Sequence, residues 1–89
     1  MKKKFEFEFE DDSLENRITF EYDDSPNDEI LDVSSDNGTT TMYANREGFM
    51  VLAKTFAKIA LGNYKYGFHI HLGKDFSDGD DILTITLVE

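Results

Sequence analysis

The first third of the chain alternates apolar and polar residues with a period of two, the pattern of half-buried strands. Segment 5–9 alternates phenylalanine with glutamate, and segment 17–22 alternates Ile18, Phe20 and Tyr22 with polar residues. One side of each segment is therefore apolar. We predict that both are strands of an antiparallel sheet.

A strong hairpin signal follows these two segments. Asn37-Gly38 separates a run around Leu31 and Val33 from the β-branched run 39–44. Both turn residues tolerate positive φ, which a tight hairpin turn requires. The four runs together predict an antiparallel meander.

The spacing of apolar residues then changes to that of a helix, predicted over residues 46–61. Asn45 is a good N-cap residue and Gly62 a plausible C-terminal cap. Lys54 and Lys58 are expected on the side away from the core. The predicted core-facing stripe consists of Phe49, Leu52, Ala53, Phe56, Ile59 and Ala60.

Two further alternating runs, 67–72 and 82–88, predict a second hairpin joined by the acidic loop 73–81. The predicted fold class is therefore α+β, with element order ββββ-α-ββ. We expect a two-layer sandwich in which one helix covers one face of a mainly antiparallel sheet of five or six strands. Residues 1–89 form a single predicted domain.

Charge and composition narrow the class of protein. The net charge is −10, which argues against a nucleic-acid partner and favours a basic one. Residues 45–74 carry five basic side chains against one acidic, so this balance of +4 leaves −14 on the remainder. No cysteine is present, and no apolar run is long enough to span a membrane. We expect a cytoplasmic protein.

The uncovered face of the predicted sheet holds the candidate chemistry. His69 and His71 alternate with Phe68, Ile70 and Leu72, so both imidazoles are expected on one exposed face. Such a face is either an ordinary solvated surface or a binding surface. Charge favours the following acidic residues as their neighbours in a partner-binding site: Glu6, Glu8, Glu21, Asp78, Asp80 and Asp81.

Other chemistry has weaker support. The spacing His69-x-His71 can chelate a metal, but zinc needs one or two more ligands, with candidates in loop 73–81 such as Asp75 and Asp78. No spacing indicates a catalytic triad. We expect no enzyme activity and no cofactor, and we keep open a metal-binding protein and a homodimer paired through the open sheet face or an edge strand.

The second half of the chain resembles the immunity protein 32 family of bacterial polymorphic toxin systems. The similar segments are Asn45-Arg46-Glu47-Gly48-Phe49-x-x-Leu52-Ala53, Gly67-Phe68-His69-Ile70-His71-Leu72 and Leu83-Thr84-Ile85. Phe49 stands where the family usually has leucine, and the link between helix and strand contains Tyr64 and Tyr66.

This resemblance implies a protein that binds and neutralises a cognate toxin in contact-dependent competition between bacteria. It marks His69 and His71 as partner-binding positions and implies no catalysis. An acidic inhibitor suits a basic toxin such as a nuclease, because complementary charge gives fast and specific association.

Overall fold

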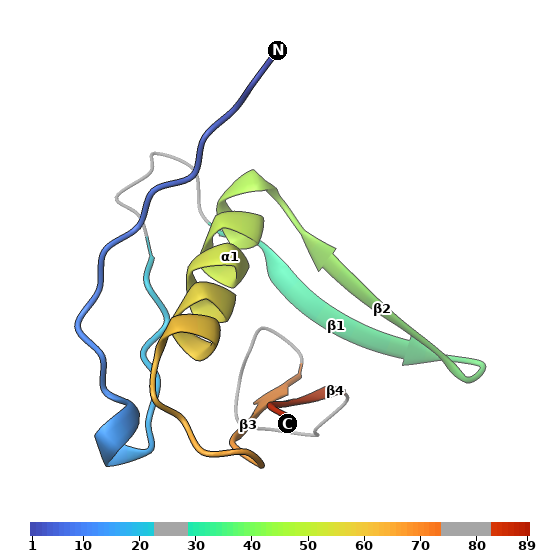
Figure 1. Ribbon diagram of the computed structural model, residues 1–89. Coiled ribbons are helices and arrows are strands. Elements are labelled where there is room, and N and C mark those ends of the chain that lie inside the picture. The colour runs from blue at the N-terminus through green and yellow to red at the C-terminus, as the bar shows by residue number, and fades with distance from the viewer. Residues whose placement is uncertain (23–28, 74–82) are drawn as a thin grey trace.

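The computed structural model describes residues 1–22, 29–73 and 83–89. Its elements are η1 (Ser13–Glu15), β1 (Leu31–Asp36), β2 (Thr39–Ala44), α1 (Arg46–Leu61), β3 (His69–Leu72) and β4 (Leu83–Thr86). Within the described residues the four strands form two separate antiparallel pairs, β1–β2 and β3–β4 (Figure 1). The fold is α+β, but the predicted sheet of five or six strands covered by one helix is wrong.

The β1–β2 hairpin confirms its turn signal. Asn37 and Gly38 have φ values of 49° and 79°, the left-handed conformation that this turn requires. The register pairs Leu31 with Ala44 and Asp36 with Thr39. Leu31 and Val33 are buried, whereas residues 35–40 at the tip are exposed and point away from the rest of the molecule (Figure 1).

The β3–β4 pair is shorter than its two predicted strands. His69 pairs with Thr86 and Leu72 pairs with Leu83. The Leu87 N–H also donates to the Phe68 carbonyl at 2.8 Å, which continues the pairing beyond β3. The predicted alternation is confirmed in β3, where Ile70 and Leu72 are buried and both histidines are exposed.

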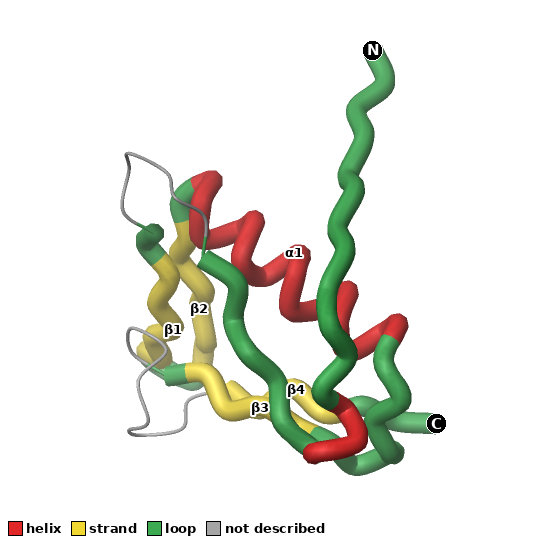
Figure 2. Tube along the Cα trace, turned by 90° about the vertical axis from the view of Figure 1, so that its left-hand side faces the viewer, coloured by secondary structure: helices red, strands yellow, loops and turns green. Residues whose placement is uncertain are grey.

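The N-terminal residues are not the two predicted strands. Segment 5–9 runs as an extended chain along one flank of α1 (Figures 1 and 2). Its rings lie next to one another. The Phe5 and Phe7 rings are tilted by 37° with centroids 6.4 Å apart, and the Phe7 and Phe9 rings are stacked with centroids 5.5 Å apart. Segment 17–22 places Ile18 and Phe20 in the core, while Tyr22 is 58% exposed. Alternation thus predicted that Phe5, Phe7 and Phe9 share a side, but not that this side meets a helix. The inward position predicted for Tyr22 is wrong.

Helix α1 has the predicted bounds, and Asn45 is its N-cap. The Asn45 side-chain oxygen accepts hydrogen bonds from the Gly48 N–H at 2.8 Å and the Ile30 N–H at 2.9 Å. It therefore joins the start of α1 to the residue before β1. At the other end, the Gly62 N–H donates to the Lys58 carbonyl at 2.9 Å.

The buried face of α1 differs from the predicted stripe. Gly48, Val51, Leu52, Thr55 and Lys58 are buried. In contrast, Phe49 is 57% and Phe56 43% exposed, and Ala60 is exposed as well. The helix is apolar around much of its circumference, so the spacing alone does not identify which side faces the core.

The core consists of two clusters of buried residues. Leu31 joins Val51 and Leu52 of α1, and Val33 joins Ile70 and Leu72 of β3. Phe20 and Met42 contact both clusters and connect them. Among the described helices, none has the length and apolarity that a membrane span needs.

Candidate functional site

The two histidines and two threonines form one exposed surface on β3–β4, which we call the imidazole face: His69, His71, Thr84 and Thr86. The register places His69 opposite Thr86 and His71 opposite Thr84, so all four side chains point to the same side. The imidazole centroids are 4.8 Å apart, with the rings edge to face at 88°. The predicted exposure of His69 and His71 on one side of the strand is confirmed, and their role in binding a partner stays a prediction.

Hydrogen bonds orient both rings. His69 Nδ1 lies 2.9 Å from the Gly67 carbonyl oxygen, which can only accept, so Nδ1 carries a proton. In the neutral ring, Nε2 is then the acceptor. His71 Nδ1 lies 3.3 Å from Thr84 Oγ1. The face therefore presents oriented polar groups that suit hydrogen bonding to another molecule.

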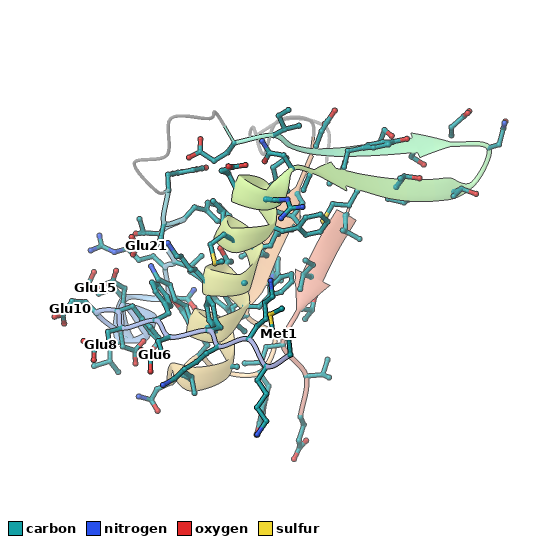
Figure 3. All side chains as sticks on the ribbon, turned by 90° about the horizontal axis from the view of Figure 1, so that it is seen from above. Met1, Glu6, Glu8, Glu10, Glu15 and Glu21 are labelled. Carbon is teal, nitrogen blue, oxygen red and sulfur yellow. The ribbon has the colours of Figure 1, made fainter. Side chains whose placement is uncertain are left out.

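A second exposed surface lies along the N-terminal segment and η1, and we call it the acidic flank: Glu6, Glu8, Glu10 and Glu15. Figure 3 shows these carboxylates together on one side of α1, and Figures 1 and 3 place β3–β4 on the other side. The predicted grouping of Glu6 and Glu8 with the histidines is therefore wrong. It assumed that segment 5–9 is a strand of the same sheet.

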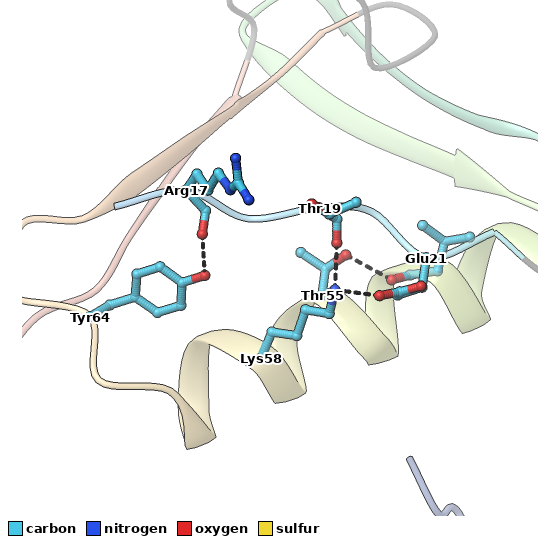
Figure 4. Close-up of polar contacts among 7 residues, drawn as sticks. Arg17, Thr19, Glu21, Thr55, Lys58 and Tyr64 are labelled. Carbon is cyan, nitrogen blue, oxygen red and sulfur yellow. Dashed lines mark hydrogen bonds and ion pairs between the residues drawn. The ribbon is translucent and has the colours of Figure 1, made fainter. Parts of the chain in front are cut away.

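Glu21 has a structural contact that the sequence did not indicate. Lys58 is only 5% exposed, and its Nζ donates to Glu21 Oε1 at 2.7 Å and to the Thr19 carbonyl at 2.8 Å (Figure 4). The same ammonium lies 5.9 Å from the centroid of the Phe9 ring. Lys58 thus joins α1 to both N-terminal segments. Lysine is rarely buried, so its charge alone predicted exposure.

A second group of contacts joins the end of α1 to residues 11–17. The Asn63 N–H donates to Ser13 Oγ at 2.9 Å, and the Tyr64 hydroxyl donates to the Arg17 carbonyl at 2.6 Å (Figure 4). Hydrogen bonds from Ser13, with a smaller contribution from Asn63, lower the pKa of the Asp11 carboxyl. Burial, aided by the negative charges of Asp11 and Asp12, raises the pKa of Tyr64. These contacts hold the base of the acidic flank against the helix.

Three predicted site residues, Asp78, Asp80 and Asp81, lie outside the described residues, as does the alternative ligand Asp75. Within the described ranges, no group of three or more metal-ligating side chains comes together. A shallow hollow of about 380 Å³ adjoins the imidazole face, lined by Asn16, Lys65, Tyr66, Gly67, Phe68 and His69. Sequence reasoning missed this hollow, because Asn16 comes from a distant segment.

The described chain thus offers two separate candidate surfaces, one built on β3–β4 and one on the N-terminal segment. Comparisons with protein-family models, with curated proteins and with solved structures find no match for this chain.

Proposed function

We propose that this protein is an immunity protein that binds a basic bacterial toxin and neutralises it by steric and electrostatic block, without catalysis. The observation that carries the proposal is the acidic flank, where exposed carboxylates gather on a segment whose Phe7 and Phe9 rings lie by the ammonium groups of Lys54 and Lys58 on α1. Lys4 and Arg17 pair with Glu6 and Glu15, but the four carboxylates of the flank outnumber these two cations. An excess of one charge raises the association rate of an oppositely charged partner.

The imidazole face supplies the second support. The resemblance of residues 45–72 to immunity protein 32 implies that His69 and His71 meet the toxin, and both side chains are exposed. In this proposal the acidic flank attracts the toxin and the imidazole face provides oriented hydrogen-bonding groups. In this proposal the protein meets the toxin in the cytoplasm, where such a toxin acts.

The test measures the association kinetics of this protein with its proposed partner, a cognate basic toxin domain, at low and high salt. We expect Glu6→Lys/Glu8→Lys to slow association by about tenfold at low salt, with a smaller effect at high salt. The matched control is Asp36→Lys/Glu89→Lys, which changes the net charge equally at two exposed positions outside the acidic flank. Equal slowing by both double variants, or no slowing by either, would contradict the proposal.

A second candidate function is metal binding by His69 and His71, favoured by their ring separation of 4.8 Å. Two imidazoles leave the remaining zinc positions to water or to other ligands. Zinc titration with thermal unfolding tests it: a midpoint that rises with zinc in the native chain, but not in His71→Gln, supports a metal site. No shift in the native chain rejects it.

A further inference from the structure

Helix α1 carries an apolar ridge that stays exposed among the residues that the structure describes. It consists of Phe49, Ala53, Phe56 and Ala60, which follow each other at spacings of four, three and four residues. This spacing places all four side chains on one side of a helix and is the a/d pattern of helix pairs. Phe49 and Phe56 remain 57% and 43% exposed.

We propose that this ridge is a homodimer interface, at which α1 pairs with α1 of a second copy in antiparallel orientation. Large and small residues alternate along the ridge. When two such helices run antiparallel about a two-fold axis, Phe49 lies opposite Ala60 of the second copy, and Phe56 lies opposite its Ala53. Each ring then meets a methyl group rather than another ring. The ridge is therefore its own complement, as a two-fold interface requires.

The charges along the helix favour the same pairing. The ridge has no charged residue between Phe49 and Ala60, because Lys58 is buried and Lys54 lies by the Phe7 ring, 5.6 Å from its centroid. One turn before Phe49, the exposed Arg46 continues the ridge. It would meet the C-terminal end of the second helix, where the helix dipole is negative.

The acidic flank does not oppose this contact. Phe7 and Phe9 lie on the flank of α1 that carries Lys54 and Lys58, at a different side of the helix from the ridge. Neither the imidazole face nor the acidic flank contributes a residue to the dimer. The inference therefore stands apart from the proposed inhibition, and either can fail alone.

The test is sedimentation equilibrium of the full chain across about a hundredfold range of concentration. We expect reversible dimerisation, with a dissociation constant raised about tenfold or more by Phe56→Glu. Leu61→Glu is the matched control, since Leu61 is 71% exposed on the same helix but off the ridge. Circular dichroism and thermal unfolding confirm that each variant remains folded. A native chain that is monomeric throughout, or a dimer that Phe56→Glu leaves intact, would overturn the proposal.

A swap of large and small residues tests the antiparallel register itself. Ala60→Phe should weaken the dimer, because it places ring against ring opposite Phe49. The double variant Phe49→Ala/Ala60→Phe restores a ring opposite a methyl group and should restore dimerisation. If the double variant dimerises no better than Ala60→Phe alone, the antiparallel register is wrong.

Discussion

Lys58 connects the helix to two segments that lie far away in the sequence. Its ammonium donates to Glu21 and to the Thr19 carbonyl while the side chain is almost completely buried. Lys58→Met keeps most of the packed stem but removes both hydrogen bonds. We expect a loss of about 1 to 3 kcal/mol in the free energy of unfolding, measured by urea denaturation.

Lys65→Met is the control for this change, since Lys65 is exposed and follows shortly after the C-terminal end of α1, where Lys58 lies. An exposed substitution of this kind should alter the free energy of unfolding by less than about 0.5 kcal/mol. Equal stability of the two variants would show that the Lys58 contacts contribute nothing measurable.

Asp11 makes stability depend on pH in the acidic range. Hydrogen bonds from Ser13 hold the pKa of its carboxyl below the ordinary value of 3.8. A lowered folded-state pKa stabilises the fold above the ordinary pKa, and this contribution is lost as the pH falls through the folded value. Asp11→Ala should therefore lower the melting temperature at neutral pH, with a difference from the native chain that shrinks below pH 3.8.

Asp36→Ala, which removes an exposed carboxylate at the hairpin tip, should show a smaller neutral-pH effect. A melting-temperature difference for Asp11→Ala that stays constant from neutral to acidic pH would contradict the prediction.

Sequence alone predicts the exposure or burial of some residues but not of others. The exposure of His69 and His71 follows from local alternation with Ile70 and Leu72, and it is confirmed. The burial of Lys58 depends on acceptors 37 and 39 residues away, which no local pattern encodes.

At the scale of elements, the close contact between α1 and the start of β1 depends on Gly48, which packs against the backbone of Ile30. A Cβ atom built on Gly48 would lie 2.1 Å from the Ile30 carbonyl oxygen. Replacing a helical glycine by alanine ordinarily adds about 1 kcal/mol of stability. Here we expect Gly48→Ala to lower the free energy of unfolding instead, because the helix must shift. A gain in stability on urea denaturation would contradict this close approach.

Helix α1 and the β1–β2 turn were predicted correctly, because neighbouring residues in the sequence determine both. The bounds of α1 follow from its cap at Asn45, and the β1–β2 turn follows from Asn37-Gly38. The N-terminal strands were predicted wrongly, because alternation at Phe5, Phe7 and Phe9 is satisfied equally by rings that lie along a helix. The buried side of α1 was ambiguous for a related reason: the helix carries two apolar stripes.

At the scale of the whole molecule, the excess of acidic groups should oppose folding. The net charge is −10, and salt screens repulsion between exposed charges over about 10 Å at 0.1 M. We expect the free energy of unfolding to rise with sodium chloride, measured with urea because guanidinium is itself a salt. A free energy that falls with added salt would show that attractive ion pairs outweigh the repulsion.

The joining of strand pairs into one sheet is the whole-molecule property that the sequence did not predict. Class α+β and the pairs β1–β2 and β3–β4 were predictable, but whether two such pairs join into one sheet depends on contacts between distant segments. Because the single predicted sheet is wrong, the predicted site residues do not share one surface. Without a common sheet, Glu6 and Glu8 lie across α1 from β3–β4, the strand pair that contains His69 and His71 (Figures 1 and 3).

The projecting β1–β2 turn makes this scaffold suitable for carrying foreign peptides. Residues 35–40 are exposed and distant from the helix, and exposed tips of this kind accept insertions readily. An epitope or fluorescent label placed between Asn37 and Gly38 would therefore extend into solvent and leave the buried clusters undisturbed.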